Sequence, residues 1–263
     1  MADTRFEAAR AKVERAKEHI RDLQGERDAF LGGNPYRITA EFYPEHGATA
    51  YFMDKFSPIP QSISLIAGDT LHSLRTALDY LAYALVERSP GYIENTHLYF
   101  PICKNREAYE SESPGKTQGI PKQIKERIDT FKPYGGGDDR LWELHRLDIV
   151  DKHRLLMTTT TVVTDIEFYV DTAFVDALFR GLLRIPKAFP KQTLKFPAPK
   201  PLFPMEQGAL LYGVKGNYET DKRVNFTFDI AISEVGIFEG NLLIETLLEL
   251  SDLVESIVMS FDV

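Results

Sequence analysis

The sequence has almost no cysteine and no long apolar run, and each scarcity excludes a class of protein. Cys103 is the only cysteine among 263 residues, so the chain can form no internal disulfide and no cysteine-rich zinc site. No apolar run approaches the ~20 residues of a membrane-spanning helix, so we expect no membrane partner. The first residues carry acids throughout and lack the apolar core of a signal peptide, which predicts a cytoplasmic protein.

Charge of one sign is missing from two long stretches. Residues 234–263 contain seven acids and no base, whereas residues 177–205 contain six bases and no acid. The net charge is −8, and a few scattered bases on an acidic protein attract a phosphate backbone only weakly. We therefore expect these bases to meet solvent or the protein's own acidic C-terminal helix, and we expect no nucleic-acid partner.

Helical and strand periodicities both occur along the chain. Residues 36–43 and 48–56 alternate apolar and polar positions around a four-residue loop, which predicts a β-hairpin. Further strands are predicted at residues 155–163, 166–170, 209–214 and 224–233. The predicted fold class is α+β, with long helices packed on an antiparallel sheet built from β-hairpins, in a single domain over residues 1–263.

Two segments have a distinctive composition. Residues 1–33 show apolar positions three and four apart, which predicts a heptad-patterned helix that ends at Gly32 and Gly33. This apolar seam could pack on another helix of the same chain, which we favour, or form a homodimer with a second copy. Residues 186–204 contain six prolines, which predicts an extended surface connection without regular structure.

The candidate site residues lie on two further predicted helices, over about residues 59–88 and 141–156. On the first helix, ionisable side chains fall within an arc of about 120° beside the apolar face. On the second, charged residues are interspersed with apolar ones around much of the circumference, which predicts a largely buried helix whose charges need partners. The residues concerned are Asp69, His72, Arg75 and Asp79 on the first helix, and His145, Asp148, Asp151 and Lys152 on the second.

We predict that the two helices pack together and that His72 and Asp148 lie on the same side of the molecule. The pooled side chains would then form a polar network, either structural or closed on a small anionic ligand, as in a binding or regulatory module. A divalent metal ion is an alternative, because each helix carries an Asp and a His spaced i, i+3. The pattern lacks Glu-x-x-His, so we expect hydrogen-bonded pairs and neither a metal nor a cofactor.

Three stretches, residues 68–82, 100–102 and 141–156, resemble a widespread set of uncharacterised bacterial proteins described only as hypothetical. They read GDTLHSLRTALDYLA, FPI and LWELHRLDIVDKHRLL. The resemblance extends over about residues 6–156, and it implies that the two helices belong together. It implies no activity.

A more distant similarity is to the HEPN ribonucleases, helical proteins that cleave RNA with an Arg-x(4–6)-His motif, usually across a dimer. Arg146 and His153 have six residues between them. The resemblance implies that His153 would act as general acid and base while Arg146 holds the scissile phosphate. Leu147 departs from the polar residue that usually follows the motif's arginine. The sequence thus leaves two alternatives to a binding module. One is a metal-independent ribonuclease, from the resemblance to the HEPN proteins, and the other is a metal-dependent hydrolase, from the Asp and His pairs on the two helices.

The structural alternative for the same motif is that both residues belong to the core. In that case Arg146 and His153 are buried helix residues, paired with acids such as Asp69 or Asp79.

Overall fold

The computed structural model describes residues 4–86, 98–154, 157–170, 192–198, 205–217 and 224–261. Over these ranges the chain forms six α-helices and two three-stranded antiparallel sheets, so the predicted α+β class is confirmed. None of the helices within these ranges is long and apolar enough to cross a membrane.

The chain divides into two compact units, each assembled from separate stretches of sequence. The helical unit comprises Met1–Glu26, Gln61–Thr158 and Glu234–Val263. The sheet unit comprises Arg27–Pro60 and Thr159–Ser233. Every contact described below lies within one of these units.

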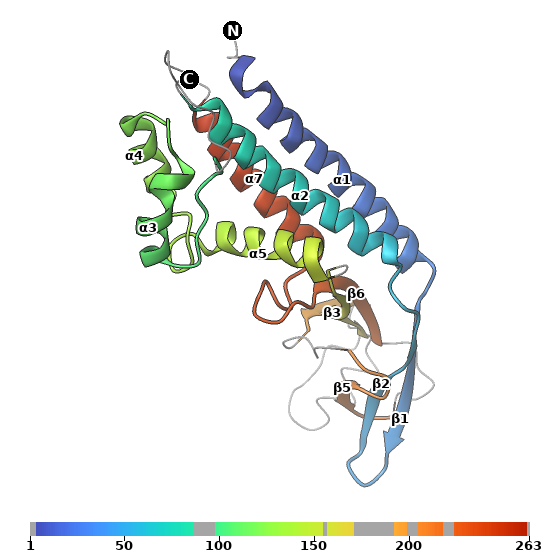
Figure 1. Ribbon diagram of the computed structural model, residues 1–263. Coiled ribbons are helices and arrows are strands. Elements are labelled where there is room, and N and C mark those ends of the chain that lie inside the picture. The colour runs from blue at the N-terminus through green and yellow to red at the C-terminus, as the bar shows by residue number, and fades with distance from the viewer. Residues whose placement is uncertain are drawn as a thin grey trace. The chain divides into compact units, whose positions relative to one another are not determined.

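Three long helices lie side by side in the helical unit, to which the first of them contributes its residues up to Glu26 (Figure 1). They are α1 (Glu7–Gly32), which follows a short 3-10 turn, α2 (Gln61–Ala84) and α7 (Leu243–Ser260). Lys17 on α1 pairs with Glu255 on α7 at 2.6 Å. The seam residues of α1 are buried inside the chain, namely Ala9, Val13, Ala16, Ile20 and Leu23. The heptad seam is therefore used within the chain, as favoured from the sequence, and a homodimer through this helix stays a prediction.

The second site helix, α5 (Asp139–Arg154), packs against α2 and follows two shorter helices, α3 (Arg106–Lys116) and α4 (Lys122–Thr130). Asp138 precedes its first residue, and the Asp138 carboxylate accepts a hydrogen bond from the backbone N–H of Arg140 at 3.1 Å. A side chain at this position satisfies an N–H group that the helix itself leaves unpaired. The last two residues of the predicted helix, 155 and 156, lie outside the described residues.

The sheet unit contains both sheets. Strands β1 (Tyr36–Tyr43), β2 (Ala48–Phe56) and β5 (Leu210–Lys215) form one sheet in the order β1-β2-β5. Strands β3 (Thr159–Val170), β4 (Gln192–Pro197) and β6 (Val224–Ile232) form the other in the order β4-β3-β6. The predicted hairpin is confirmed, because β1 and β2 pair antiparallel along their length. The two strands predicted within residues 155–170 are one strand, β3, with an irregularity between Val163 and Asp165.

The prediction that residues 186–204 lack regular structure is wrong for the part that the structure describes. Residues 192–197 form β4, which pairs antiparallel with β3. The six-residue stretch holds only Pro197, at its end, and within the described residues it pairs on one side only. A proline is tolerated at such a place because no ladder hydrogen bond is lost there.

Candidate functional site

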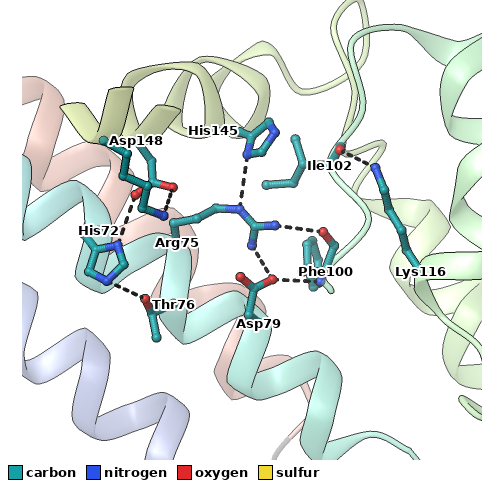
Figure 2. Close-up of polar contacts among 10 residues, drawn as sticks. His72, Arg75, Thr76, Asp79, Phe100, Ile102, Lys116, His145 and Asp148 are labelled. Carbon is teal, nitrogen blue, oxygen red and sulfur yellow. Dashed lines mark hydrogen bonds and ion pairs between the residues drawn. The ribbon is translucent and has the colours of Figure 1, made fainter. Parts of the chain in front are cut away.

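The candidate site lies where α2 and α5 meet. Figure 2 shows His72 directed toward Asp148, and their side chains lie 3.2 Å apart, so the predicted packing of the two helices is confirmed. Gly68 of α2 lies against the side chain of Asp151 on α5. A Cβ atom added there would lie 2.6 Å from Cγ of Asp151, well inside van der Waals contact. Glycine therefore admits the Asp151 side chain beside α2, and larger residues at position 68 would push it away.

The first part of the site, the inner cluster, consists of Arg75, Asp79, His145 and the backbone of Phe100. All three nitrogens of the Arg75 guanidinium donate hydrogen bonds: to Asp79 at 2.7 Å, to the Phe100 carbonyl at 3.2 Å and to Nδ1 of His145 at 3.4 Å. Asp79 also accepts from the Phe100 backbone N–H at 3.0 Å. Arg75 is buried, with 8% of its side chain exposed. The inner cluster thus ties α2 to α5 and to the segment around Phe100 (Figure 2).

Protonation in the inner cluster follows from burial. Burial, followed by the charge of Arg75, lowers the pKa of His145 to about 4, so this ring is neutral near pH 7. Because Nδ1 of His145 accepts from Arg75, the proton of the neutral ring is on Nε2. Burial also raises the pKa of Asp79, and Arg75 opposes that shift by favouring the charged carboxylate.

The second part of the site, the outer cluster, consists of His72, Asp148 and Lys152. Asp148 is buried, with 4% of its side chain exposed, and it binds His72 through one carboxylate oxygen and Lys152 through the other, the latter at 2.6 Å. The His72 side chain is 50% exposed and that of Lys152 is 42% exposed. A carboxylate only accepts, so Nδ1 of His72 is the donor, and its Nε2 lies 3.5 Å from the hydroxyl of Thr76.

Two further acids lie close to the outer cluster. Burial, then the charges of Asp148 and Asp69, raise the pKa of Asp151, while His72 and Lys152 act in the opposite direction. Asp69 is exposed on α2. Asp69, Asp148 and Asp151 outnumber Lys152. Acidic side chains are therefore in excess around His72.

The structure describes the side chain of only one residue of the HEPN-like motif, Arg146. Arg146 donates to the backbone carbonyl of Gly236 at 2.8 Å and is half-buried. The structural alternative places Arg146 in the core beside an acid such as Asp69 or Asp79, whereas the described partner of Arg146 is a backbone carbonyl and that of Asp79 is Arg75. The side chain of His153 lies outside the described part of the structure. The ribonuclease interpretation stays a prediction.

The structure adds partners that the sequence did not reveal. The Phe100 backbone groups and the hydroxyl of Thr76 join the network. Two residues beyond Phe100, the carbonyl of Ile102 accepts from Lys116 of α3 at 3.4 Å (Figure 2). A signal for Thr76 was present in the sequence, since it lies four residues after His72 on the same helix face. No local signal could identify the backbone partners.

Metal coordination was the remaining alternative for this site. Within the described residues, no group of three or more His, Cys, Asp or Glu side chains is arranged to hold a metal ion. The candidate ligands are divided between the clusters, because His145 binds Arg75 whereas His72 and Asp148 bind each other.

Comparison with known proteins gave no relative from which function could be transferred. No protein-family model, no curated protein and no solved structure matches this chain. The functional argument therefore rests on the geometry of the two clusters.

Proposed function

We propose that the helical unit is a binding or regulatory module in which the inner cluster is structural and the outer cluster is the accessible part. The observation that carries the proposal is the burial of Arg75 among hydrogen-bond partners of the same chain. All three of its nitrogens bind groups of the same chain, and the side chain is buried. An arginine that holds a substrate phosphate needs access to solvent, and the buried side chain of Arg75 lacks it.

The outer cluster has the opposite properties. His72 and Lys152 are about half exposed, while the buried Asp148 fixes the orientation of both. A preoriented histidine beside a lysine is a suitable contact point for a ligand or a partner side chain. The excess of acids around it works against the small anionic ligand expected from the sequence. We therefore expect the outer cluster to favour a neutral or positively charged group.

Two substitutions separate the roles of the clusters. Arg75→Met should lower the melting temperature of the protein, because it leaves the Asp79 carboxylate half-buried without its partner. His72→Gln should leave the melting temperature almost unchanged, because His72 is half exposed and Asp148 keeps its pair with Lys152. Equal destabilisation by both variants would show that the outer cluster is structural too and would contradict the proposal.

An RNA cleavage assay distinguishes the module from a nuclease. The purified protein, incubated with RNA in the presence of a chelator, should leave the RNA intact. Cleavage by the wild type would contradict the module if the His153→Ala variant cleaved RNA ~10²–10⁴-fold more slowly and melted at the same temperature. That result would establish a metal-independent ribonuclease instead.

The sign of the ligand charge can be tested at His72 directly. Inorganic phosphate, added at constant ionic strength, should cause no saturable shift of the His72 ring signals in NMR spectra. A saturable shift that is absent in the Lys152→Met variant would contradict this expectation and support an anionic ligand.

A further inference from the structure

The sheet unit contains an open cavity that is separate from both clusters of the helical unit. Its volume is about 690 Å³, and small-molecule sites commonly measure roughly 300–1,000 Å³. All of the described residues that line it belong to the sheet unit. They are Leu31, Asn34, Pro35, Tyr36, Ile38, Ala40 and Tyr51, together with residues 224–228 of β6.

Four aromatic residues are part of the lining. The rings of Tyr36 and Phe228 have centroids 4.2 Å apart, and those of Tyr51 and Phe226 are 5.7 Å apart. The hydroxyl of Tyr36 hydrogen-bonds to Thr161 of β3 at 3.0 Å, which fixes the position of that ring. The cavity thus presents ring surfaces that the fold itself orients.

Strand β6 also contributes to the lining of the cavity. Within the described residues, β6 pairs only with β3, and five consecutive β6 residues line the cavity. Val224, Phe226 and Phe228 are half-buried, whereas Asn225 and Thr227 are exposed. The half-buried and the exposed side chains therefore point to opposite faces of β6.

The described lining residues include no charged side chain. A charged ligand group would lose water there without gaining an ionic partner, which is unfavourable. Aromatic rings instead favour the faces and edges of other flat rings, in offset or edge-to-face contact. Side-chain amides such as those of Asn34 and Asn225 can both donate and accept hydrogen bonds.

We propose that this cavity binds an uncharged small molecule built on a flat ring system. The ring system lies against Tyr36, Phe226 and Phe228, and side-chain amides of the lining supply its hydrogen-bond partners. The site lies wholly within the sheet unit, so the proposal for the helical unit stands or falls separately.

The test uses two fluorescent probes that share their rings and differ in charge. N-phenyl-1-naphthylamine is uncharged, and 8-anilinonaphthalene-1-sulfonate carries a sulfonate. The full-length protein should bind the uncharged probe saturably, with one probe per chain and at least tenfold tighter than the sulfonate. Absence of saturable binding, or tighter binding of the sulfonate, would overturn the proposal.

A matched pair of variants locates the site. Ala40→Phe places a ring in the cavity and should weaken binding of the uncharged probe at least tenfold. Ala50 lies on the neighbouring strand β2, adjacent to Tyr51 in sequence and hence on the opposite face, so Ala50→Phe should leave binding unchanged. Equal effects of the two variants would place the probe elsewhere.

A third variant serves where Ala40→Phe fails to fold, as judged by circular dichroism. Asn225→Lys changes an exposed residue of the wall, and it should weaken the uncharged probe while strengthening the sulfonate. Unchanged affinities for both probes would contradict the proposed site. Displacement of the uncharged probe by an extended apolar peptide, but not by naphthalene-2-methanol, would identify a strand-addition groove and overturn the small-molecule proposal.

Discussion

Acid is expected to destabilise the helical unit through His145. The folded protein holds the pKa of His145 at about 4, compared with 6.5 for an unperturbed histidine. The unfolded chain therefore takes up the proton first as the pH falls. The contribution of the neutral His145 ring to the free energy of unfolding is complete above pH 6.5. It is lost progressively between pH 6.5 and about pH 4.

The size of the effect follows from the two pKa values. One pH unit within this window corresponds to about 1.4 kcal/mol, and the loss between pH 8 and pH 5 is about 2 kcal/mol. The raised pKa values of Asp79 and Asp151 act in the opposite direction, because their folded forms take up protons before the unfolded chain does. The stability that these two charged carboxylates cost the folded protein is recovered as the pH falls through their folded pKa values. This gain must be separated from the loss of stability caused by His145.

The His145→Asn variant makes this separation. The side-chain oxygen of the introduced asparagine can accept from Arg75 as Nδ1 of His145 does, but the amide does not titrate. Urea unfolding at pH 5 to pH 8 gives the free energy of unfolding for both proteins. Trp142, the only tryptophan, lies in the helical unit with its ring centroid 5.8 Å from that of His145, so its fluorescence reports on this unit.

The wild type should lose about 2 kcal/mol more than His145→Asn between pH 8 and pH 5. Parallel pH dependence of the two proteins would refute the reasoning, since the His145 ring would then be as easily protonated in the folded state as in the unfolded chain. An NMR titration that places the pKa of His145 at 6 or above would refute it independently.

Three further predictions concern the packing of the helical unit. Arg75→Met should lower the free energy of urea unfolding by about 3 kcal/mol, whereas Arg106→Met, which breaks an exposed i, i+4 pair, should cost less than about 1 kcal/mol; similar losses would contradict the structural role of the inner cluster. Gly68→Ala should destabilise the wild type by roughly 1–3 kcal/mol through overpacking, but in an Asp151→Ala background it should stabilise by up to about 1 kcal/mol through helix propensity, and the same sign in both backgrounds would disprove the close contact. Asp138→Ala should lower the melting temperature and cost about 1 kcal/mol, because α5 loses its N-cap, and an unchanged melting temperature would show that the cap is dispensable.

Local patterns explain the successful predictions from sequence. The hairpin of β1 and β2 was predictable because alternation with a period of two is a local property of each strand. The packing of α2 on α5 was predictable from the charged residues that stand between the apolar residues of α5. A helix at the surface keeps its charges on the solvent face, so this pattern indicates a largely buried helix. The predicted proximity of His72 and Asp148 follows from that packing.

The details that failed depend on tertiary structure. The partners of Arg75 include the Phe100 backbone, 25 residues away, and nothing in the local sequence indicates that contact. Strand β4 was missed because the surrounding prolines suggested irregular structure, whereas the pairing with β3 stabilises a short stretch that contains proline only at its end. The cavity of the sheet unit was also unpredictable, since its walls come from strands far apart in the sequence.

The interleaving of the two units has a consequence for the order in which the protein can fold. The helical unit needs segments from the beginning, middle and end of the chain, so α7 is the last of them to leave the ribosome. Until α7 has been made, the apolar surface of α2 that packs against α7 stays exposed. The contact between these two helices closes a long loop of the chain, and such contacts form slowly. The sheet unit is complete at Ser233, before α7 is made. Nascent chains should therefore acquire protease resistance in the sheet unit first, and the helical unit should depend on chaperones that cover α2 during synthesis.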